Sequence, residues 1–189
     1  MNLTLVRHTT PDIAPGICYG QADIDVAASF ATELQSLRHR LPQLLATTIY
    51  SSPLRRCLKL ARAFAGDAEV LEDARLMELD FGDWELKPWD EIPRGLVDVW
   101  ADDHVMQAPP QGESFHELSL RAKDFLHQVS TNYSGQNLLV FTHAGVIRAL
   151  LSEALNLSLT DTFRLQIDYG SVTQITLDKT ITRVVYVNR

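Results

Sequence analysis

The sequence predicts a three-layer α/β/α fold with a mainly parallel sheet and an antiparallel edge. Short apolar segments alternate with amphipathic segments at helical spacing, which is typical of parallel strands joined by crossover helices. Near the C-terminus, two strand-like segments are separated only by a turn, which indicates a hairpin. The chain of 189 residues is long enough for one domain with a sizeable core, and we expect a single domain over residues 1–189.

The first half of the chain begins with two strands and two helices. An apolar strand over residues 3–6 leads into a loop interrupted by Pro and Gly, and helical spacing then continues up to Pro42. The apolar positions of this first helix are Phe30, Leu34, Leu37 and Leu41. Residues 47–51 predict a second strand, and Pro53 is well placed to begin a second helix. The buried stripe expected for this second helix is Leu54, Leu58, Ala61 and Ala65.

The middle of the chain is less regular. Residues 69–71 predict a short third strand, whereas residues 83–112 contain all three tryptophans and follow no clear period. We expect residues 83–112 to form a cap-like excursion from the domain. Ser114 and Glu117 then match a helix capping box. The apolar face of the helix that follows is Phe115, Leu118, Ala122, Phe125 and Val129.

The C-terminal part completes the alternation. Residues 138–142 predict a buried strand and residues 146–155 an apolar helix. Residues 171–177 and 181–187 predict a hairpin with its turn at Asp178-Lys179. This hairpin is the antiparallel edge of the predicted sheet.

The charge and the apolar pattern exclude several classes of protein. A net charge of −7 argues against general affinity for nucleic acid, although a few arginines in a concave site can still bind a small anion. The apolar runs are too short to cross a bilayer, and no leader-like segment precedes the first strand. The two cysteines give no sign of a disulfide framework. We therefore expect a cytoplasmic protein that binds neither membranes nor nucleic acid.

Chemically active side chains stand at the ends of two predicted strands. The first strand ends on Arg7-His8, and the strand over residues 138–142 ends on His143. In open α/β sheets, ligands bind outside the carboxyl ends of the strands. The two histidines are therefore expected to converge on one pocket, although they are far apart in the sequence.

Four segments follow one another in a recognisable order: Arg7-His8, Ser51–Cys57, Leu76–Glu85 and Thr142–Arg148. On these segments the chain resembles the histidine phosphatase superfamily, the fold shared with cofactor-dependent phosphoglycerate mutases, over essentially its whole length. The resemblance implies a phosphomonoester hydrolase that works through a phosphohistidine and needs no metal or other cofactor.

The resemblance also implies roles for individual residues. His8 would be the nucleophile, and neutral imidazole is competent to attack phosphorus. His143 would bind the phosphoryl group and stabilise its charge in the transition state. Glu78 would protonate the leaving alkoxide and then activate water.

Arginine side chains suit the binding of a phosphate dianion, because each offers bidentate donors to the charged oxygens. Arg7 and one residue of the pair Arg55-Arg56 would supply these donors. The two neighbours lie about 100° apart on a helix, and the helical wheel alone does not choose between them. The family pattern places the phosphate-binding arginine directly before a small residue, here Cys57, and so selects Arg56.

The chain departs from the family pattern at three glycines. Thr9 follows the nucleophile, Ala144 follows the second histidine, and Leu86 follows Trp84-Glu85. None of these changes removes a reactive group, but each alters the backbone freedom near the pocket.

A narrower resemblance concerns the first loop. The Arg-His-Thr-Thr-Pro start, followed by Cys-Tyr-Gly-Gln and an Asp at position 23, is similar to the alpha-ribazole-5′-phosphate phosphatases of cobalamin nucleotide loop synthesis. Tyr19 and Gln21 would then offer an aromatic face and an amide to a flat base and ribose hydroxyls. Gly16, Gly20 and Pro15 equally explain this segment as a plain turn-rich loop.

Other functions stay open at this point. Within the family, the alternatives are a broad-specificity phosphatase and a phosphoglycerate mutase, and the short chain favours hydrolysis. A metallohydrolase would use His8, Asp12 and His143 as ligands, but the chain lacks a compact ligand cluster and Arg7 would repel the cation. The last alternative is a phosphate-binding module without catalysis.

Overall fold

The structure is a computed structural model that describes residues 1–41, 48–178 and 181–189. Its sheet has six strands in the order β3-β2-β4-β1-β5-β6. The strands are β1 (Asn2–Arg7), β2 (Thr48–Ser51), β3 (Val70–Glu72), β4 (Asn137–Thr142), β5 (Val172–Leu177) and β6 (Thr182–Tyr186). Strands β1 to β4 pair in parallel, whereas β5 and β6 pair antiparallel. The predicted fold class, including the antiparallel edge, is confirmed.

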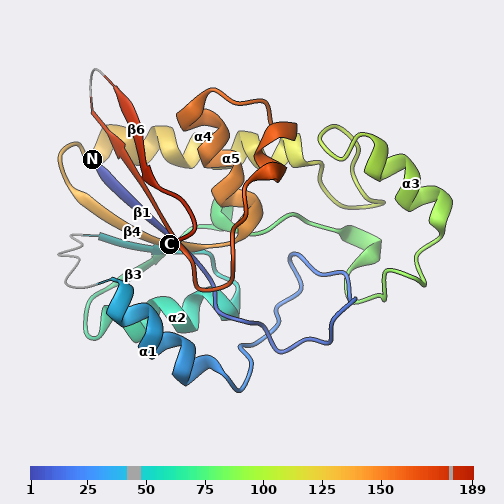
Figure 1. The fold of residues 1–189 in the computed structure, drawn as a ribbon, viewed down its shortest axis with the longest axis horizontal. Helices are drawn as coiled ribbons and strands as arrows, with labels where there is room; N and C mark the ends of the chain where they lie inside the picture. Colours follow the sequence, from blue (N-terminus) through green and yellow to red (C-terminus); the bar gives the residue numbers. More distant parts are fainter. Residues whose placement is uncertain (42–47, 179–180) are drawn as a thin grey trace.

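Helices cover both faces of the sheet (Figure 1). They are α1 (Phe30–Arg40), α2 (Arg55–Ala65), α3 (Arg94–Asp102), α4 (Phe115–Asn132) and α5 (Ala144–Leu155), with 3-10 turns at Ala74–Leu76, Gly82–Trp84 and Thr160–Arg164. Alternate strand residues face opposite layers: Leu138 and Val140 pack with α4 and α5, whereas Leu139 and Phe141 pack with α1 and α2. The sheet is therefore buried on both sides, as its continuous apolar strands predict.

The register of the two central strands brings their ends together. Arg7 of β1 lies opposite Thr142 of β4, and the His8 amide donates to the Thr142 carbonyl at 3.0 Å. His8 and His143 are the residues that follow these two strand ends. Helix α5 begins at Ala144, two residues before the predicted start, so His143 is the residue that precedes its first turn.

Helix α2 buries only part of the stripe predicted for it. Its fully or nearly fully buried positions are Arg56, Cys57, Leu60 and Ala61. Leu54 and Ala61 of the expected stripe are buried, whereas Leu58 and Ala65 are half-buried. The helix begins at Arg55, with Leu54 as N-cap. The apolar pattern was only partly right, because the buried face of the helix also carries the guanidinium of Arg56.

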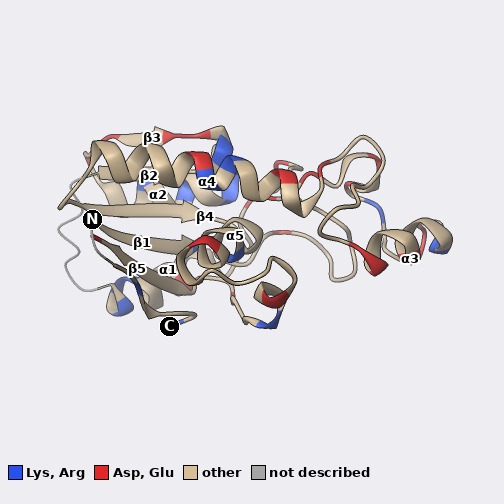
Figure 2. Cartoon of the chain, turned by 90° about the horizontal axis from the view of Figure 1, so that it is seen from above, with Lys and Arg blue, Asp and Glu red and all other residues tan. Residues whose placement is uncertain are grey.

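Residues 83–112 form a lobe that contains α3 and lies beyond the carboxyl ends of the parallel strands (Figures 1 and 2). Trp84 and Ile92 are buried in it against Cys18, with Trp89 and Trp100 packed around them. The indole rings of Trp89 and Trp100 stack at 5.9 Å. The lobe thus has an aromatic cluster of its own, and we use the name α3 lobe for residues 83–112 below.

The remaining boundaries follow the sequence closely. The capping box of Ser114 and Glu117 is present at the start of α4, and all five expected apolar positions of this helix are buried. Three predicted boundary residues lie outside the described residues: Pro42 at the end of the first helix, Thr47 at the start of the second strand, and Lys179 in the hairpin turn. No helix within the described ranges is both long and apolar enough to span a bilayer.

Candidate active site

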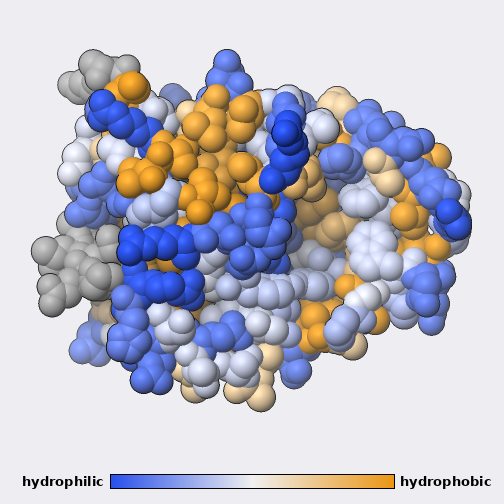
Figure 3. Space-filling view, viewed as in Figure 1, coloured by the Kyte–Doolittle hydropathy of each residue, from blue (hydrophilic) through white to orange (hydrophobic). Residues whose placement is uncertain are grey.

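A cavity of about 250 Å³ opens at the carboxyl ends of β1 and β4. It is lined by Arg7, His8, Tyr19, Glu78, Leu79, Phe81, Phe115, Ala144, Gly145, Arg148 and Phe163. The space-filling view shows a hollow in the surface between the main body and the α3 lobe (Figure 3). Both charged groups and aromatic rings line the cavity, so it can receive a molecule that carries an anionic group and an apolar one.

His8 is held in one tautomer by the backbone. Its Nδ1 lies 2.7 Å from the Thr9 carbonyl oxygen. Because a carbonyl can only accept, Nδ1 carries the proton and Nε2 keeps its lone pair. Burial, together with the positive charges of Arg56 and Arg7, holds the pKa of His8 well below its usual value of 6.5. His8 is therefore a neutral imidazole with a free nucleophilic nitrogen.

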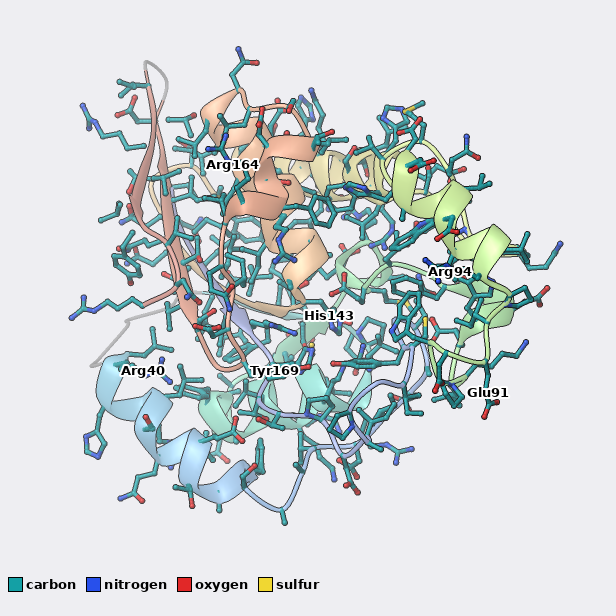
Figure 4. The ribbon with its side chains drawn as sticks, turned by 45° about the vertical axis from the view of Figure 1, so that its right-hand side comes forward. Arg40, Glu91, Arg94, His143, Arg164 and Tyr169 are labelled. Carbon is teal, nitrogen blue, oxygen red and sulfur yellow. The ribbon has the colours of Figure 1, made fainter. Side chains whose placement is uncertain are left out.

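His143 lies beside His8, with 5.1 Å between the ring centroids. It is fully buried, and its Nε2 lies 2.9 Å from the Ser52 hydroxyl. Burial and the charge of Arg56 hold the pKa of His143 well below 6.5. His143 and Tyr169 both lie near the centre of the view in Figure 4. The structure thus brings together the two histidines that end β1 and β4.

Two guanidinium groups flank the histidines. Arg7 donates to the Ile167 carbonyl at 2.5 Å, and its guanidinium stacks on the Tyr169 ring at 3.8 Å. Arg56 is fully buried and places Nη2 3.4 Å from His143 Nδ1. Its neighbour Arg55 is exposed instead, and it pairs with Asp23 at 3.5 Å. The helical wheel could not decide which of Arg55 and Arg56 faces the site, and the structure places Arg56 there.

Several buried polar atoms on residues next to His8 in the chain or in the site have no partner. They include the Nε atoms of Arg7 and Arg56 and the hydroxyls of Thr9 and Ser171. Buried donors are almost always paired in folded proteins, so a group of unpaired ones indicates a place where a polar ligand or water binds. With two cations among them, these groups favour an anion.

Glu78 approaches the same cavity from the opposite side. Its carboxylate accepts from the Gly145 amide, at 3.2 Å to each oxygen, and Oε1 also accepts from the Leu79 amide at 3.0 Å. The Glu78 carbonyl accepts from Arg121 at 2.9 Å, and Arg121 pairs with Glu113. Both the side chain and the backbone of Glu78 are therefore fixed.

The two loop residues expected to meet a substrate lie in different places. Tyr19 lines the cavity, and its hydroxyl lies 2.6 Å from that of Tyr169. Gln21 is not among the lining residues. Its amide nitrogen donates to the Glu78 carbonyl at 3.1 Å and lies 3.5 Å from Glu113 Oε1. The structure thus gives the Gln21 side chain partners within the protein, in place of the expected contact with ribose hydroxyls.

Two of the three departures from the family pattern need no unusual backbone. Among the described non-glycine residues with positive φ, neither Thr9 nor Ala144 occurs, whereas Leu86 has a φ of 64°. Leu86 is also 58% exposed. The replacement of the usual glycine therefore strains the backbone at Leu86.

Sequence reasoning missed several residues around the site. Ser52 contacts His143, Tyr169 stacks on Arg7, and Arg148 lines the cavity near Phe163. Ser52 and Arg148 belong to the segments Ser51–Cys57 and Thr142–Arg148 that carry the family resemblance, so their position in the sequence indicated a place near the site. Tyr169 lies in the turn before β5, outside these segments, and gave no such indication. Within the described ranges, no group of three or more His, Cys, Asp or Glu residues could hold a metal ion.

Comparisons with known proteins agree with this geometry. The family model described as "Histidine phosphatase superfamily (branch 1)" matches residues 3–189. The chain is 28% identical to the "Putative phosphoserine phosphatase 2" of Hydrogenobacter thermophilus, over 99% of this chain and 95% of that protein. It is 25% identical to the "Adenosylcobalamin/alpha-ribazole phosphatase" of Escherichia coli K12, over 95% of this chain and 91% of that protein.

Among solved structures, the chain is similar to the alpha-ribazole phosphatase from Shigella flexneri. The TM-score is 0.92 at 24% identity, with 100% of this chain and 96% of that chain covered. At this identity the likeness shows the fold.

Proposed function

Because this chain belongs to the histidine phosphatase superfamily and is a phosphomonoesterase of that superfamily, we propose that it hydrolyses its substrate through a phosphohistidine on His8. The observation that carries the proposal is the state of His8. Its imidazole is neutral, its Nε2 is free, and it lies between Arg7 and Arg56, whose Nε atoms are buried without partners. A nucleophile between unpaired cationic donors suits attack on a phosphate dianion.

The reaction would take two steps. In the first, Nε2 of His8 forms a bond to phosphorus while the bond from phosphorus to the ester oxygen breaks, and Glu78 gives a proton to the leaving alkoxide. In the second, water attacks the phosphohistidine, Glu78 accepts a proton from this water, and phosphate leaves. Arg7, Arg56 and His143 would bind the phosphoryl oxygens throughout, because the two guanidinium charges and the N–H donors of these side chains match the charge on these oxygens.

For the substrate we propose alpha-ribazole 5′-phosphate. Besides the charged groups, the cavity is lined by Phe81, Phe115 and Phe163, together with Leu79 and Tyr19. Aromatic side chains of this kind can stack on a flat, largely apolar base. The Escherichia coli relative carries alpha-ribazole phosphatase in its name and supports the same choice.

A second candidate is phosphoserine. Arg148 lines the cavity, and its Nε is buried without a partner. A guanidinium in this position could bind the carboxylate of a small phosphorylated amino acid. The relative from Hydrogenobacter thermophilus carries phosphoserine phosphatase in its name.

Labelling tests the intermediate. After brief incubation with a 32P-labelled phosphomonoester, the protein should carry label that survives alkali and is lost in acid. The variant His8→Ala should carry none, whereas His127→Ala, which removes an exposed histidine on α4, should be labelled like the wild type. Label on serine or aspartate, or full activity of His8→Ala, would contradict the proposal.

A comparison of kcat/KM values tests the substrate. Alpha-ribazole 5′-phosphate should exceed phosphoserine, 3-phosphoglycerate and p-nitrophenyl phosphate. Phe163→Ala should lower the value for alpha-ribazole 5′-phosphate by about 2- to 10-fold, as expected for one lost aromatic contact, and spare phosphoserine. Higher values for phosphoserine, lost in Arg148→Gln, would favour the second candidate. Isomerisation of phosphoglycerate faster than its hydrolysis would instead indicate a mutase.

A further inference from the structure

The Glu85 carboxylate binds four backbone amides that come from two separate loops. Oε2 accepts from Gly20 at 2.9 Å and from Ala22 at 3.1 Å. Oε1 accepts from Gln21 at 2.8 Å and from Phe81 at 3.1 Å. Each carboxylate oxygen thus receives two N–H donors. Only a group that accepts at both ends can do this, because an amide side chain would turn its own NH2 toward two of the donors.

The three-residue turn that Glu85 holds also anchors Arg56. The Gly20 carbonyl accepts from Arg56 Nη2 at 2.6 Å, and the Ala22 carbonyl accepts from Nη1 at 2.9 Å. The amides of Gly20 and Ala22 therefore point to Glu85, while their carbonyls point to Arg56. With both Nη atoms fixed in this way, the unpaired Nε of Arg56 has a defined direction.

The same turn contacts the backbone of Glu78. Gln21 donates its side-chain amide to the Glu78 carbonyl at 3.1 Å. Gly20 also lies close to Leu79, the residue after Glu78. A Cβ atom at Gly20 would be 1.7 Å from the Leu79 carbonyl oxygen. The turn is therefore wedged between Arg56 on one side and the Glu78-Leu79 backbone on the other.

Glu85 itself is fixed by the base of the α3 lobe. It follows the 3-10 turn Gly82–Trp84, and Trp84 is buried in the aromatic cluster with Cys18 and Ile92. The position of the carboxylate is thus set by packing that lies outside the cavity.

We propose that Glu85 is a positioning residue that, through the Gly20–Ala22 turn, sets the placement of the Arg56 guanidinium relative to the Glu78 carboxylate. This inference rests on the proposed function, in which Arg56 binds the phosphoryl group and Glu78 protonates the leaving group. Glu85 touches neither substrate nor reacting atoms. Its effect passes through the turn to a phosphate anchor and to a proton donor, which can be measured separately.

The test compares three variants with the wild type. Glu85→Gln keeps the size of the side chain but removes two of the four acceptor contacts. Gln21→Met removes the link to the Glu78 carbonyl and the longer contact with Glu113, but keeps the backbone amide that binds Glu85. Glu91→Gln is the matched control, because Glu91 is an exposed carboxylate on the same lobe and lies at its outer edge (Figure 4).

Two readouts separate the effects. Binding of inorganic phosphate, measured by calorimetry, reports on Arg56. The ratio of kcat/KM for glycerol 2-phosphate to kcat/KM for p-nitrophenyl phosphate reports on Glu78 as proton donor, because kcat/KM covers only the steps up to the phosphohistidine and an alkoxide needs a proton donor far more than p-nitrophenolate does. Glu85→Gln should weaken phosphate binding by about 10-fold and lower the ratio by about 10-fold. Gln21→Met should lower the ratio alone, and Glu91→Gln should change neither.

Wild-type phosphate affinity and an unchanged ratio in Glu85→Gln would overturn the inference. So would equal losses on both substrates that follow a lower melting temperature, since these indicate a general loss of folded protein. If Glu85→Gln does not fold, Gln21→Met decides, because an unchanged ratio there removes the link to Glu78. A wild type that hydrolyses no phosphomonoester would refute the proposed function, whereas the phosphate-binding arm would still test the link from Glu85 to Arg56.

Discussion

The close approach of α5 to Glu78 makes Gly145→Ala a sharp test of the proposed proton donor. A Cβ atom at Gly145 would lie 2.2 Å from Glu78 Oε1 and 3.2 Å from Leu118 Cδ1. Cβ atoms essentially never come within 3.0 Å of such a neighbour, so the carboxylate has to retreat from 2.2 Å to at least that distance. A misplacement of roughly 1 Å in a reacting group can lower a rate by about 100-fold, or about 2.7 kcal/mol.

The expected loss is selective in two ways. Alanine is favoured over glycine in a helix by up to about 1 kcal/mol, so the melting temperature of Gly145→Ala should not fall in proportion to its activity. Hydrolysis of glycerol 2-phosphate should drop by about 100-fold, whereas hydrolysis of p-nitrophenyl phosphate should drop much less, because p-nitrophenolate leaves without a proton.

The assay is steady-state kinetics on both substrates together with thermal unfolding. Gly95→Ala serves as the control, since it is the same substitution in the first turn of α3 and its Cβ would meet no atom within 4 Å. This control should keep wild-type kinetics. If Gly145→Ala hydrolyses glycerol 2-phosphate at the wild-type rate, either Glu78 is not the proton donor or its carboxylate does not act from the position described.

Four further predictions follow from the same geometry. Arg56→Ala should remove about 2–4 kcal/mol of transition-state stabilisation, measured from kcat/KM, as for loss of a strong oxyanion donor. Arg55 is exposed, so Arg55→Ala should lower kcat/KM only slightly, and a larger loss in Arg55→Ala than in Arg56→Ala would contradict the assignment. Buried His8 and His143 stay neutral below pH 6.5 while the unfolded chain takes up protons there, so stability should fall as the pH drops below 6.5, by at most about 1.4 kcal/mol per pH unit for each histidine. Urea unfolding at pH 7.5 and pH 6.0 measures this, and His8→Gln should reduce the slope. Leu86→Gly should raise the free energy of unfolding by up to about 1 kcal/mol, because Leu86 is exposed at a φ of 64°; a loss of stability would show that its side chain packs favourably. Prolonged chelation should leave the rate unchanged, because arginines supply the positive charge at the site, and a loss that zinc or magnesium restores would favour a metallohydrolase.

The parts of this protein that the sequence predicts well are those that local periodicity determines. The strands that end just before His8 and His143 are short apolar runs, and their parallel pairing brings the two ends together. The apolar face and capping box of α4 are local in the same sense. At α2 periodicity predicts only part of the buried face. It misses Arg56, which is buried because the Gly20 and Ala22 carbonyls accept from its guanidinium.

The least predictable part is the loop before α1, and the reason lies in its hydrogen bonds. A turn such as Gly20–Ala22 has no regular neighbour for its amides, yet buried backbone donors must be paired. Here the partner is Glu85, more than 60 residues later in the chain, so no window along the sequence contains both. Gln21 shows the consequence: from the sequence its amide seemed free for a ligand, whereas in the fold Glu78 and Glu113 accept from it. A polar residue in a site loop therefore becomes a candidate for substrate contact only after the backbone groups beside it have found their partners.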